Sequence, residues 1–543
     1  QYGGAVFRGT EAYQGYSYNN TFKNNYAEIH GGAINWNATS GNVTNSHFYD
    51  NEAGKAGGAI FVGAHGGSGV ITDSVFEDNK VNMEYGRGGA VDWYASGEIL
   101  NSNFTNNQAA YGGAVFIGKN GGTGNITNCT FTLNCATRNG GAIDWNASSG
   151  KLTNCEFNYN VADYGGAVFR GQAAKNGEGS DNVFIGNHAR VNGGAIDWNA
   201  SEGNVTNYKF YNNSAGKNGG AVFVGANGTA GTILNSVFEN NSAQNRGGAV
   251  DWYASSGHIL WSNFTNNHAD YGGGVYVGGK SDHGTIANVL FESNTAVHNG
   301  GAIDWNATRG ELQNTTFKYN KAEYGAALCR EVNATGGFGT NNTFIANHAY
   351  KSGAALGWMG SQNITIIDYH FFDNTANETG GAIYVGPSST GCSVIDCEFD
   401  GNHIIGNTSG QGGAIDWVAG KGTVKNSNFT NNYAYEGGAI YVGAQDGETV
   451  INGSEFEDNH AFNCGGAINL YSSTVIINDT EFNRNTAELS GGALFIDGAG
   501  HVDEIYSSSF VGNNATTGKG GAIDWVASSG HIEESYFEKK YAE

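Results

Sequence analysis

One short motif recurs along the whole chain and constrains its fold more than any other feature. Residues 140–147 read Gly-Gly-Ala-Ile-Asp-Trp-Asn-Ala, and near copies begin at Gly193 and Gly300. A second version, Gly-Gly-Ala-Val-Phe-Val-Gly at residues 219–225, alternates with the first. Each copy is followed by Phe-x-x-Asn, as at residues 104–107. The chain is therefore one small unit copied roughly twenty times, which predicts a repeat architecture.

The length of the repeated unit and its pattern of residue types favour strands over helices. Neighbouring copies begin 24 to 32 residues apart, and no stretch shows a helical period over ten residues. Short β-branched and aromatic runs are bounded by Gly and Asn, which is typical of strands. Each run can pair with its copy one coil above and below, at about 4.8 Å. We predict an all-β, right-handed parallel β-helix (solenoid) of about twenty coils, continuous over residues 1–543.

Because equivalent residues of successive coils stack on one another, the repeat predicts ladders of identical side chains in the core. The Phe of Phe-x-x-Asn is expected to face inward, with a small residue two positions earlier on the same face. The motif's Asn is expected at a corner, where its amide can bond the backbone or the next Asn. Gly-Gly supplies the backbone freedom of another corner. The inward Phe ladder includes Phe104, Phe131, Phe157, Phe184 and Phe210; the small column includes Ser46, Ser74, Ser102, Cys129 and Cys155.

Composition narrows the classes of partner. The 543 residues carry a formal net charge of −24, and only 14% are charged. Such a chain is repelled by phosphates, so neither nucleic acid nor an anionic membrane is expected as a partner. No apolar run is long enough to cross a bilayer and no signal peptide is visible, so this segment is not expected to insert directly into a membrane. We expect no cofactor, although the negative charge is compatible with divalent cations.

A column of aspartates and aromatic residues alternates along the Gly-Gly-Ala motif. The neighbouring Trp column must face the other way. Whichever column faces out, the motif is expected to carry a long apolar stripe, typical of a binding or assembly surface. In the alternative, corner loops cover the stripe. The candidate lateral face consists of Phe61, Phe116, Phe223, Tyr276, Tyr384, Tyr441, Asp92, Asp144, Asp197, Asp251, Asp304, Asp416 and Asp524.

The aspartate row favours packing over catalysis. Copies of one Asp recur every second coil, about 9–10 Å apart at strand spacing. Glycoside cleavage needs one asymmetric site with two differently tuned carboxyl groups. Since no aspartate of the row has a distinctive second carboxyl group beside it in the sequence pattern, we do not expect an enzyme and assign no catalytic residue.

Two sets of residues indicate covalent modification. Asn-x-Ser/Thr sequons recur at matching loop positions, so glycan is expected on some of them. Cys129 and Cys155 hold one slot in successive coils, which predicts Cα atoms within disulfide range; Cys392 and Cys397 are a weaker pair. Two buried thiols are the alternative. The sequons are Asn37, Asn103, Asn125, Asn146, Asn199, Asn204, Asn227, Asn240, Asn263, Asn306, Asn363, Asn428 and Asn478.

The two ends of the sequence continue one another. Joined head to tail, residues 537–543 and 1–5 reproduce the spacing of residues 22–33. Free solenoids need polar caps and none is visible. The ends therefore predict copies stacked by strand addition, or a slice of a longer array; an arbitrary boundary is the alternative. The predicted joining residues are Gln1, Tyr2, Gly3, Gly4, Phe537, Tyr541 and Glu543.

Gly-Gly-Ala-(Ile/Val) together with Phe-x-x-Asn resembles the polymorphic outer membrane protein repeats of chlamydiae. Sequences such as Asn-Ser-Asn-Phe-Thr-Asn-Asn resemble adhesin-like surface proteins of methanogenic archaea even more closely. The resemblance covers essentially all of the chain, although Phe537 lacks its Asn and Gly325 and Gly353 begin Gly-Ala-Ala. It implies a β-helix, an extracellular location at the cell surface, and adhesive or envelope-structural roles.

Three functions follow in order of preference. The first is a structural cell-surface protein that assembles head to tail with itself, and possibly sideways, into a filament or sheath. The second is an adhesin that binds carbohydrate or another cell-surface protein. The third, least favoured, is a polysaccharide lyase or hydrolase.

Overall fold

The computed structural model describes residues 1–38, 40–64, 68–118, 123–147, 149–172, 174, 178–199, 203–225, 231–253, 256–279, 282–332, 334–406, 408–419, 421–443, 447–471, 474–497, 502–526 and 529–542. These residues form strands and turns without a helix, so they hold no helix that could cross a membrane. The predicted fold class is confirmed as a parallel β-solenoid of about 18 turns, close to the number expected. Two compact units, Gln1–Asn263 with Asn267–Ala269 and Phe264–Asn266 with Asp270–Glu543, are described separately below.

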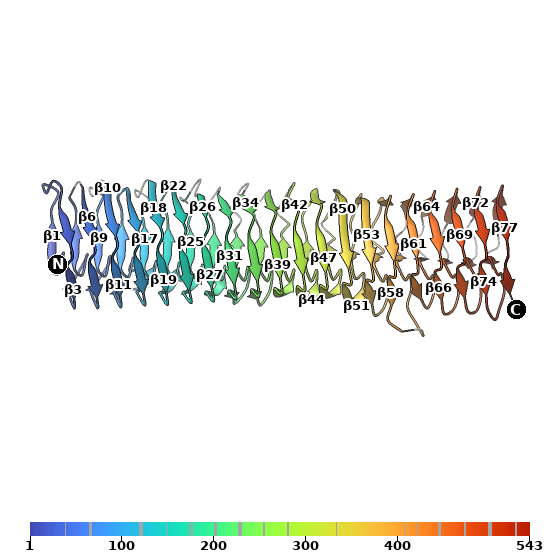
Figure 1. The fold of residues 1–543 in the computed structure, drawn as a ribbon, viewed down its shortest axis with the longest axis horizontal. Coiled ribbons are helices and arrows are strands. Elements are labelled where there is room, and N and C mark those ends of the chain that lie inside the picture. Colours follow the sequence, from blue (N-terminus) through green and yellow to red (C-terminus); the bar gives the residue numbers. More distant parts are fainter. Residues whose placement is uncertain are drawn as a thin grey trace. The chain divides into compact units, whose positions relative to one another are not determined.

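One coil of the first unit shows the plan of the fold. It runs through β5 (Ile34–Trp36), β6 (Ser40–Thr44), β7 (His47–Tyr49) and β8 (Glu52–Ala53). The next coil begins with β9 (Ile60–Val62), which lies beside β5 and pairs with it in parallel (Figure 1). Equivalent strands of successive coils therefore pair with each other, which satisfies the backbone of segments too short to fold alone.

The second unit repeats the plan. Its β45 (Ile303–Trp305), β49 (Leu328–Arg330) and β52 (Leu356–Trp358) pair in parallel and in register. In this unit β50 (Gly337–Ile345) and β53 (Thr365–Phe372) each run without a break through two successive strand positions. The coils at residues 325–360, which depart most from the repeat in sequence, are therefore still paired as strands.

The predicted phenylalanine ladder forms the hydrophobic core. Phe104, Phe131 and Phe157 have no exposed surface, and the ring centroids of successive members lie 4.8 and 4.9 Å apart. Their planes differ by 7° or less, so the rings stack at the spacing of the strands. The small column is also buried, as Ser102 and Cys129 show.

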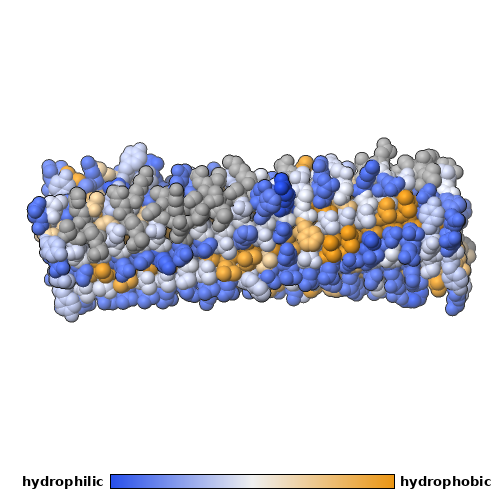
Figure 2. All heavy atoms as spheres, turned by 90° about the horizontal axis from the view of Figure 1, so that it is seen from above, coloured by the Kyte–Doolittle hydropathy of each residue, from blue (hydrophilic) through white to orange (hydrophobic). Residues whose placement is uncertain are grey.

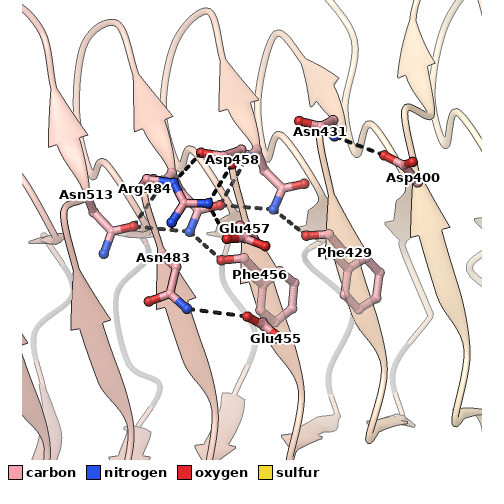
Figure 3. A network of polar contacts seen from close by, with 12 residues as sticks. Asp400, Phe429, Asn431, Glu455, Phe456, Glu457, Asp458, Asn483, Arg484 and Asn513 are labelled. Carbon is pink, nitrogen blue, oxygen red and sulfur yellow. Dashed lines mark hydrogen bonds and ion pairs between the residues drawn. The ribbon is translucent and has the colours of Figure 1, made fainter.

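A second ladder of buried asparagines fixes the corner after each Phe. In the second unit, Asn485 Nδ2 donates to the Phe456 carbonyl at 2.8 Å and to Asn513 Oδ1 at 3.1 Å. Outside this ladder, Arg484 donates to both carboxylate oxygens of Asp458, at 2.9 and 2.8 Å (Figure 3). The predicted role of the motif's Asn is confirmed, since its amide bonds both the backbone and the next Asn.

The paired glycines are required by close approaches of the backbone. Gly140 has a φ of +62°, and a Cβ there would lie 2.0 Å from the Ile143 carbonyl oxygen. A Cβ on Gly141 would lie 2.0 Å from the Gly166 carbonyl oxygen in the next coil. Both positions exclude a larger residue, because real Cβ atoms do not approach this closely.

The structure shows which column of the motif faces the core. Trp145 Cζ2 lies 2.2 Å from where a Cβ on Gly150 would stand, and Gly150 belongs to β22 (Ser149–Thr153) of a different sheet. Trp145 is 4% exposed and Ile143 is fully buried. The Ile/Trp column therefore points inward, and the Asp/aromatic column points the other way.

Candidate functional site

The outward Asp/aromatic column is covered, which corrects the expectation of an exposed stripe. The aspartates Asp92, Asp144, Asp197, Asp251, Asp304 and Asp416 are at most 3% exposed, and Asp524 is half-buried. Phe116, Tyr276 and Tyr441 are at most 8% exposed, and Phe61, Phe223 and Tyr384 are half-buried. On the face drawn in Figure 2, polar residues predominate and apolar residues form separate patches. The alternative of covering corner residues therefore describes this column better.

Asp92 shows how the cover is built. The residue before Gly-Gly, Arg87, places its Nε 3.2 Å from Asp92 Oδ2, and its Nη1 donates to the Tyr94 hydroxyl. The guanidinium lies 4.9 Å from the Tyr94 ring centroid and 5.1 Å from that of Phe116. Burial raises the pKa of Asp92 to about 7, although Arg87 acts in the opposite direction. Corner residues on both sides of the strand thus enclose the carboxyl group.

The same enclosure recurs along the row. Arg246 Nη2 lies 3.2 Å from Asp251 Oδ2, and burial raises the pKa of Asp251 to about 7. Burial also raises the pKa of Asp144 and of Asp197 well above the ordinary value. Asn146 Nδ2 donates to Asp144 Oδ1 at 2.6 Å. Carboxyl groups in these surroundings serve the packing of the coil edge, and solvent has little access to them.

A larger departure from the repeat lies in the first unit, after β12 (Lys80–Val81). Asn79 and Gly88 are nine positions apart, whereas the equivalent Asn107 and Gly112 are five apart. The four extra residues lie within residues 82–86, which form a turn closed by the Gly86 amide; this amide donates to the Met83 carbonyl at 2.8 Å. This insertion gives the site its shape.

The inserted turn is anchored to its own coil and to the next. The Gly86 carbonyl accepts hydrogen bonds from the amides of Ala110 and Tyr111, both at 3.0 Å. A Cβ on Gly86 would lie 2.4 Å from Val81 Cγ1, and Val81 packs with Ala109 in a buried cluster. The backbone of the turn is therefore held in place while its side chains project outward.

Those side chains form an aromatic and cationic surface. Tyr85 is 64% exposed and Met83 is 49% exposed. Arg138, from a later coil, lies 5.0 Å from the Tyr85 ring centroid and 6.0 Å from that of Tyr111. Its Nη2 also lies 3.4 Å from Glu84 Oε1. The aromatic rings are thus pre-oriented by a shared cation.

Two adjoining hollows share Met83, Glu84 and Tyr111. One, of about 660 Å³, also includes His30, Lys55 and Arg87. The other, of about 790 Å³, extends to Arg138, Asp163 and Tyr164. We call the inserted turn and these two hollows the loop groove. Their volumes are in the range of known ligand sites.

Some of the charged side chains around the loop groove form ion pairs with described residues and one does not. Glu84 pairs with Arg138 and Arg87 pairs with Asp92. Lys55, in contrast, is exposed and forms no ion pair with any residue that the structure describes. Burial, followed by the charges of Arg87 and Lys55, lowers the pKa of His30 to about 4, so this ring is neutral at physiological pH. A free cation therefore stands beside the aromatic side chains, in a chain whose net charge is −24.

One cluster in the second unit could hold a metal ion. Ligand atoms of Asp304, Cys329 and Glu331 lie within 4.8 Å of one another. Asp304 and Cys329 are opposite each other on β45 and β49. Asn299 Nδ2 donates to Glu331 Oε1 at 2.5 Å. A thiolate with two carboxylates would suit zinc better than calcium or magnesium, although burial and both carboxylates raise the pKa of the Cys329 thiol well above its usual value.

The predicted modification sites fall into two groups. Asn103, Asn204, Asn240, Asn263, Asn363 and Asn428 are exposed, whereas Asn37, Asn125, Asn146, Asn199, Asn306 and Asn478 are half-buried; Asn227 lies outside the described residues. All seven cysteines are free thiols here, and the Cys129 amide lies 3.4 Å from Cys155 Sγ. The predicted stacking of these two residues is present; a bridge between them stays a prediction, as does one between Cys392 and Cys397.

The predicted joining residues are described in part. Tyr2, Phe537 and Tyr541 are 46%, 39% and 68% exposed. Gln1 and Gly4 are exposed, Gly3 is half-buried, and Glu543 lies outside the described residues. Their role in assembly stays a prediction.

The loop groove was not predicted from the sequence, because the repeated positions carry no information about an insertion in a single coil. The available signal was the spacing of Asn79 and Gly88, which is long for the first unit, together with Met83 and Tyr85 in the added residues. Arg138 could not be assigned to the same site, since its contact with Tyr85 spans two coils.

The match to a family model supports the repeat assignment. The repeat of the Chlamydia polymorphic membrane protein matches residues 128–144, 235–251, 288–304, 368–386 and 426–443. A probable autotransporter of Escherichia coli K12, YfaL, is 27% identical over 244 residues, which cover 40% of this chain and 19% of that protein. The solved structure of the PL6-family alginate lyase AlyGC matches with a TM-score of 0.22 and 9% identity over 97% of each chain. The predicted resemblance to polymorphic membrane protein repeats is confirmed, and that to archaeal adhesin-like proteins stays a prediction.

Proposed function

We propose that this chain is a cell-surface adhesin whose β-solenoid presents the loop groove to an acidic oligosaccharide. The surface location is supported by the similarity to polymorphic membrane protein repeats and to a probable autotransporter. The adhesive role is supported by the one insertion in the first unit that places exposed Tyr85 and Met83 beside Arg138. A distinctive loop on a repeated scaffold is a common way of carrying a binding site.

The chemistry of the loop groove favours a sugar with an acidic group. Tyr85 and Tyr111 offer flat apolar faces on which a pyranose ring can pack. Lys55 offers a charge that no described carboxylate neutralises. A uronate or sulfated sugar stacked on the rings would bring its negative group toward that charge. The observation that carries the proposal is the Arg138 guanidinium, which lies 5.0 Å from the Tyr85 ring centroid and 6.0 Å from that of Tyr111 and so links the two aromatic side chains.

Replacing Tyr85 by alanine is expected to weaken binding about tenfold, because one aromatic platform is worth roughly 1.4 kcal/mol. The measurement is titration of the whole chain against hits from an array of neutral, uronate-bearing and sulfated oligosaccharides. Lys55→Gln should lower affinity for the acidic sugars alone and flatten its dependence on salt.

The matched control is Tyr350→Ala, which removes another half-exposed tyrosine in the second unit. Equal losses in Tyr85→Ala and Tyr350→Ala would mean that the surface binds sugars without a site. An array with no hit above background, tested with correctly folded protein, would refute the proposal.

End-to-end assembly into a filament or sheath, which is the first preference from the sequence, is kept here as a second proposal. Its test is electron microscopy of the purified chain, with regular polymers as the expected result. A strictly monomeric chain would remove it. No catalytic role is proposed for the aspartate row.

A further inference from the structure

A half-buried arginine of the first unit, Arg170, occupies a slot that holds Trp, Val or Ile in most other coils and an arginine at Arg8. Arg170 ends β25 (Val168–Arg170) and is opposite Trp145 in one neighbouring coil and Trp198 in the other. Its guanidinium lies 5.5 Å from the Trp198 ring centroid. Burial lowers the pKa of Arg170. A half-buried guanidinium without an ion partner among the described residues is a position at which an anion can bind.

A cavity of about 20 Å³ adjoins this guanidinium. Its lining includes Trp145, Leu152, Arg170, Trp198 and Tyr208. Such a volume has room for one water molecule or one ion of similar size. The cavity could therefore hold one small counter-ion, but not a molecule as large as a sugar.

The groups around the cavity offer donors in excess. Arg170 forms no ion pair or side-chain hydrogen bond with any residue within the described ranges, and the indole Nε1–H of the 1% exposed Trp198 has no acceptor there. Glu178 also lines the cavity, but its carboxylate is 61% exposed and lies 3.1 Å from Lys151 Nζ. Because that carboxylate is already paired with Lys151, the donors that remain favour an anion over water, which brings no charge.

Tyr208 supplies the third polar group. It is 3% exposed, and its hydroxyl lies 1.8 Å from where a Cβ on Gly179 would stand. Burial raises the pKa of Tyr208, with Arg170 acting in the opposite direction, so the hydroxyl keeps its proton and can donate. Gly179 thus leaves the space that this hydroxyl needs.

The second unit contains the same combination. Arg330 is 3% exposed and lies 5.3 Å from the Trp305 ring centroid. The Tyr369 hydroxyl lies 1.8 Å from where a Cβ on Gly339 would stand. Here, however, Arg330 Nη1 donates to the Gly336 carbonyl at 3.3 Å. An internal acceptor therefore already serves Arg330, and Arg170 is left as the stronger candidate.

We propose that Arg170, Trp198 and Tyr208 form an interior site for one small monovalent anion of the halide class. Arg170 supplies the charge, and all three side chains can donate hydrogen bonds into the cavity. The site is independent of the loop groove, so either proposal can fail without the other.

The test uses the whole chain crystallised and soaked in sodium bromide, with anomalous diffraction at the bromine edge. A peak within hydrogen-bond distance of the Arg170 guanidinium is expected, and it should vanish in Arg170→Val. Valine is suited to this slot because Val224 occupies it in a nearby coil, 2% exposed. Arg190→Gln is the matched control, since Arg190 is exposed and paired with Asp163 at 3.0 Å, and it should keep the peak.

Chloride-35 line broadening in solution provides a second measurement that does not need crystals of the variant. Broadening by the native chain should fall in Tyr208→Phe, which removes only a hydroxyl, and remain in Arg190→Gln. Bromide found only on the surface and retained in Arg170→Val would be an adventitious ion only. That result, or a cavity without an anomalous peak at saturating bromide, would overturn the proposal.

Discussion

Replacing Asn134 by leucine is expected to lower the free energy of unfolding by about 4 kcal/mol or more, because several buried polar groups lose their partners at once. Asn134 Nδ2 donates to the Phe104 carbonyl and to Asn160 Oδ1, both at 3.0 Å. Asn134 Oδ1 accepts from the backbone amide and from Nδ2 of Asn107, also at 3.0 Å. Leucine has a similar size but neither donates nor accepts.

Three buried groups lose a hydrogen-bond partner through this change: the Phe104 carbonyl, the Asn107 amide and Asn107 Nδ2. Asn107 Nδ2 keeps its second bond, to the Phe76 carbonyl at 3.1 Å, and Asn160 Oδ1 keeps the bond from the backbone amide of residue 134. Each unpaired buried group costs about 1–3 kcal/mol. The losses need not add, because all three belong to one network.

Denaturant unfolding followed by circular dichroism measures the effect. The matched control is Asn103→Leu, which changes the same residue type at an exposed position next to Phe104 and should alter stability by no more than about 0.5 kcal/mol. Equal stabilities of the two variants would contradict the role given to the asparagine ladder.

The ladders could be predicted because they depend on residues close in sequence and repeated in every coil. Phe104 and Asn107 lie within one four-residue motif, and stacking carries each to its own copy. The glycine pairs follow equally directly, since Gly140 and Gly141 are recognisable from the repeat and their close contacts are with backbone. Such features need only the period of the chain and the spacing of parallel strands.

Burial of the outward column could not be predicted from the same pattern. Whether Asp92 is exposed depends on Arg87 and Tyr94, which vary from coil to coil and come from both corners of the strand. The loop groove depends on Arg138 reaching Tyr85 across two coils. The repeat period fixes which residues are in register, but not how a long side chain bends from one coil to another.

Replacing Asp416 by asparagine is expected to stabilise the protein at pH 8 and to stabilise it much less at pH 5. Asp416 is 1% exposed in the second unit, and its neighbours in register are Tyr384 and Tyr441. Burial raises the pKa of Asp416 to about 7, only partly opposed by a hydrogen bond with Thr379. The charged form is therefore disfavoured in the folded chain.

The sign follows from proton linkage. Because the folded pKa of Asp416 lies above its ordinary value of 3.8, the folded state binds more protons between those two pH values. Stability is therefore highest below about pH 4 and falls as the pH rises toward 7, by a total on the order of 4 kcal/mol for this group. Asparagine cannot ionise, and Asn469 shows that it fits, since it occupies the same slot and is 3% exposed.

Unfolding at pH 5 and pH 8 tests the expectation. Asp416→Asn should reduce the loss of stability between these pH values without abolishing it, since the raised pKa values of Asp92 and Asp251, both about 7, place two other carboxyl groups in the same range. Asp373→Asn, an exposed change in the same unit, should leave the native pH dependence intact. Parallel curves for the native chain and Asp416→Asn would show that Asp416 does not bury its charge at pH 8, and the physical account of the whole aspartate row would then be wrong.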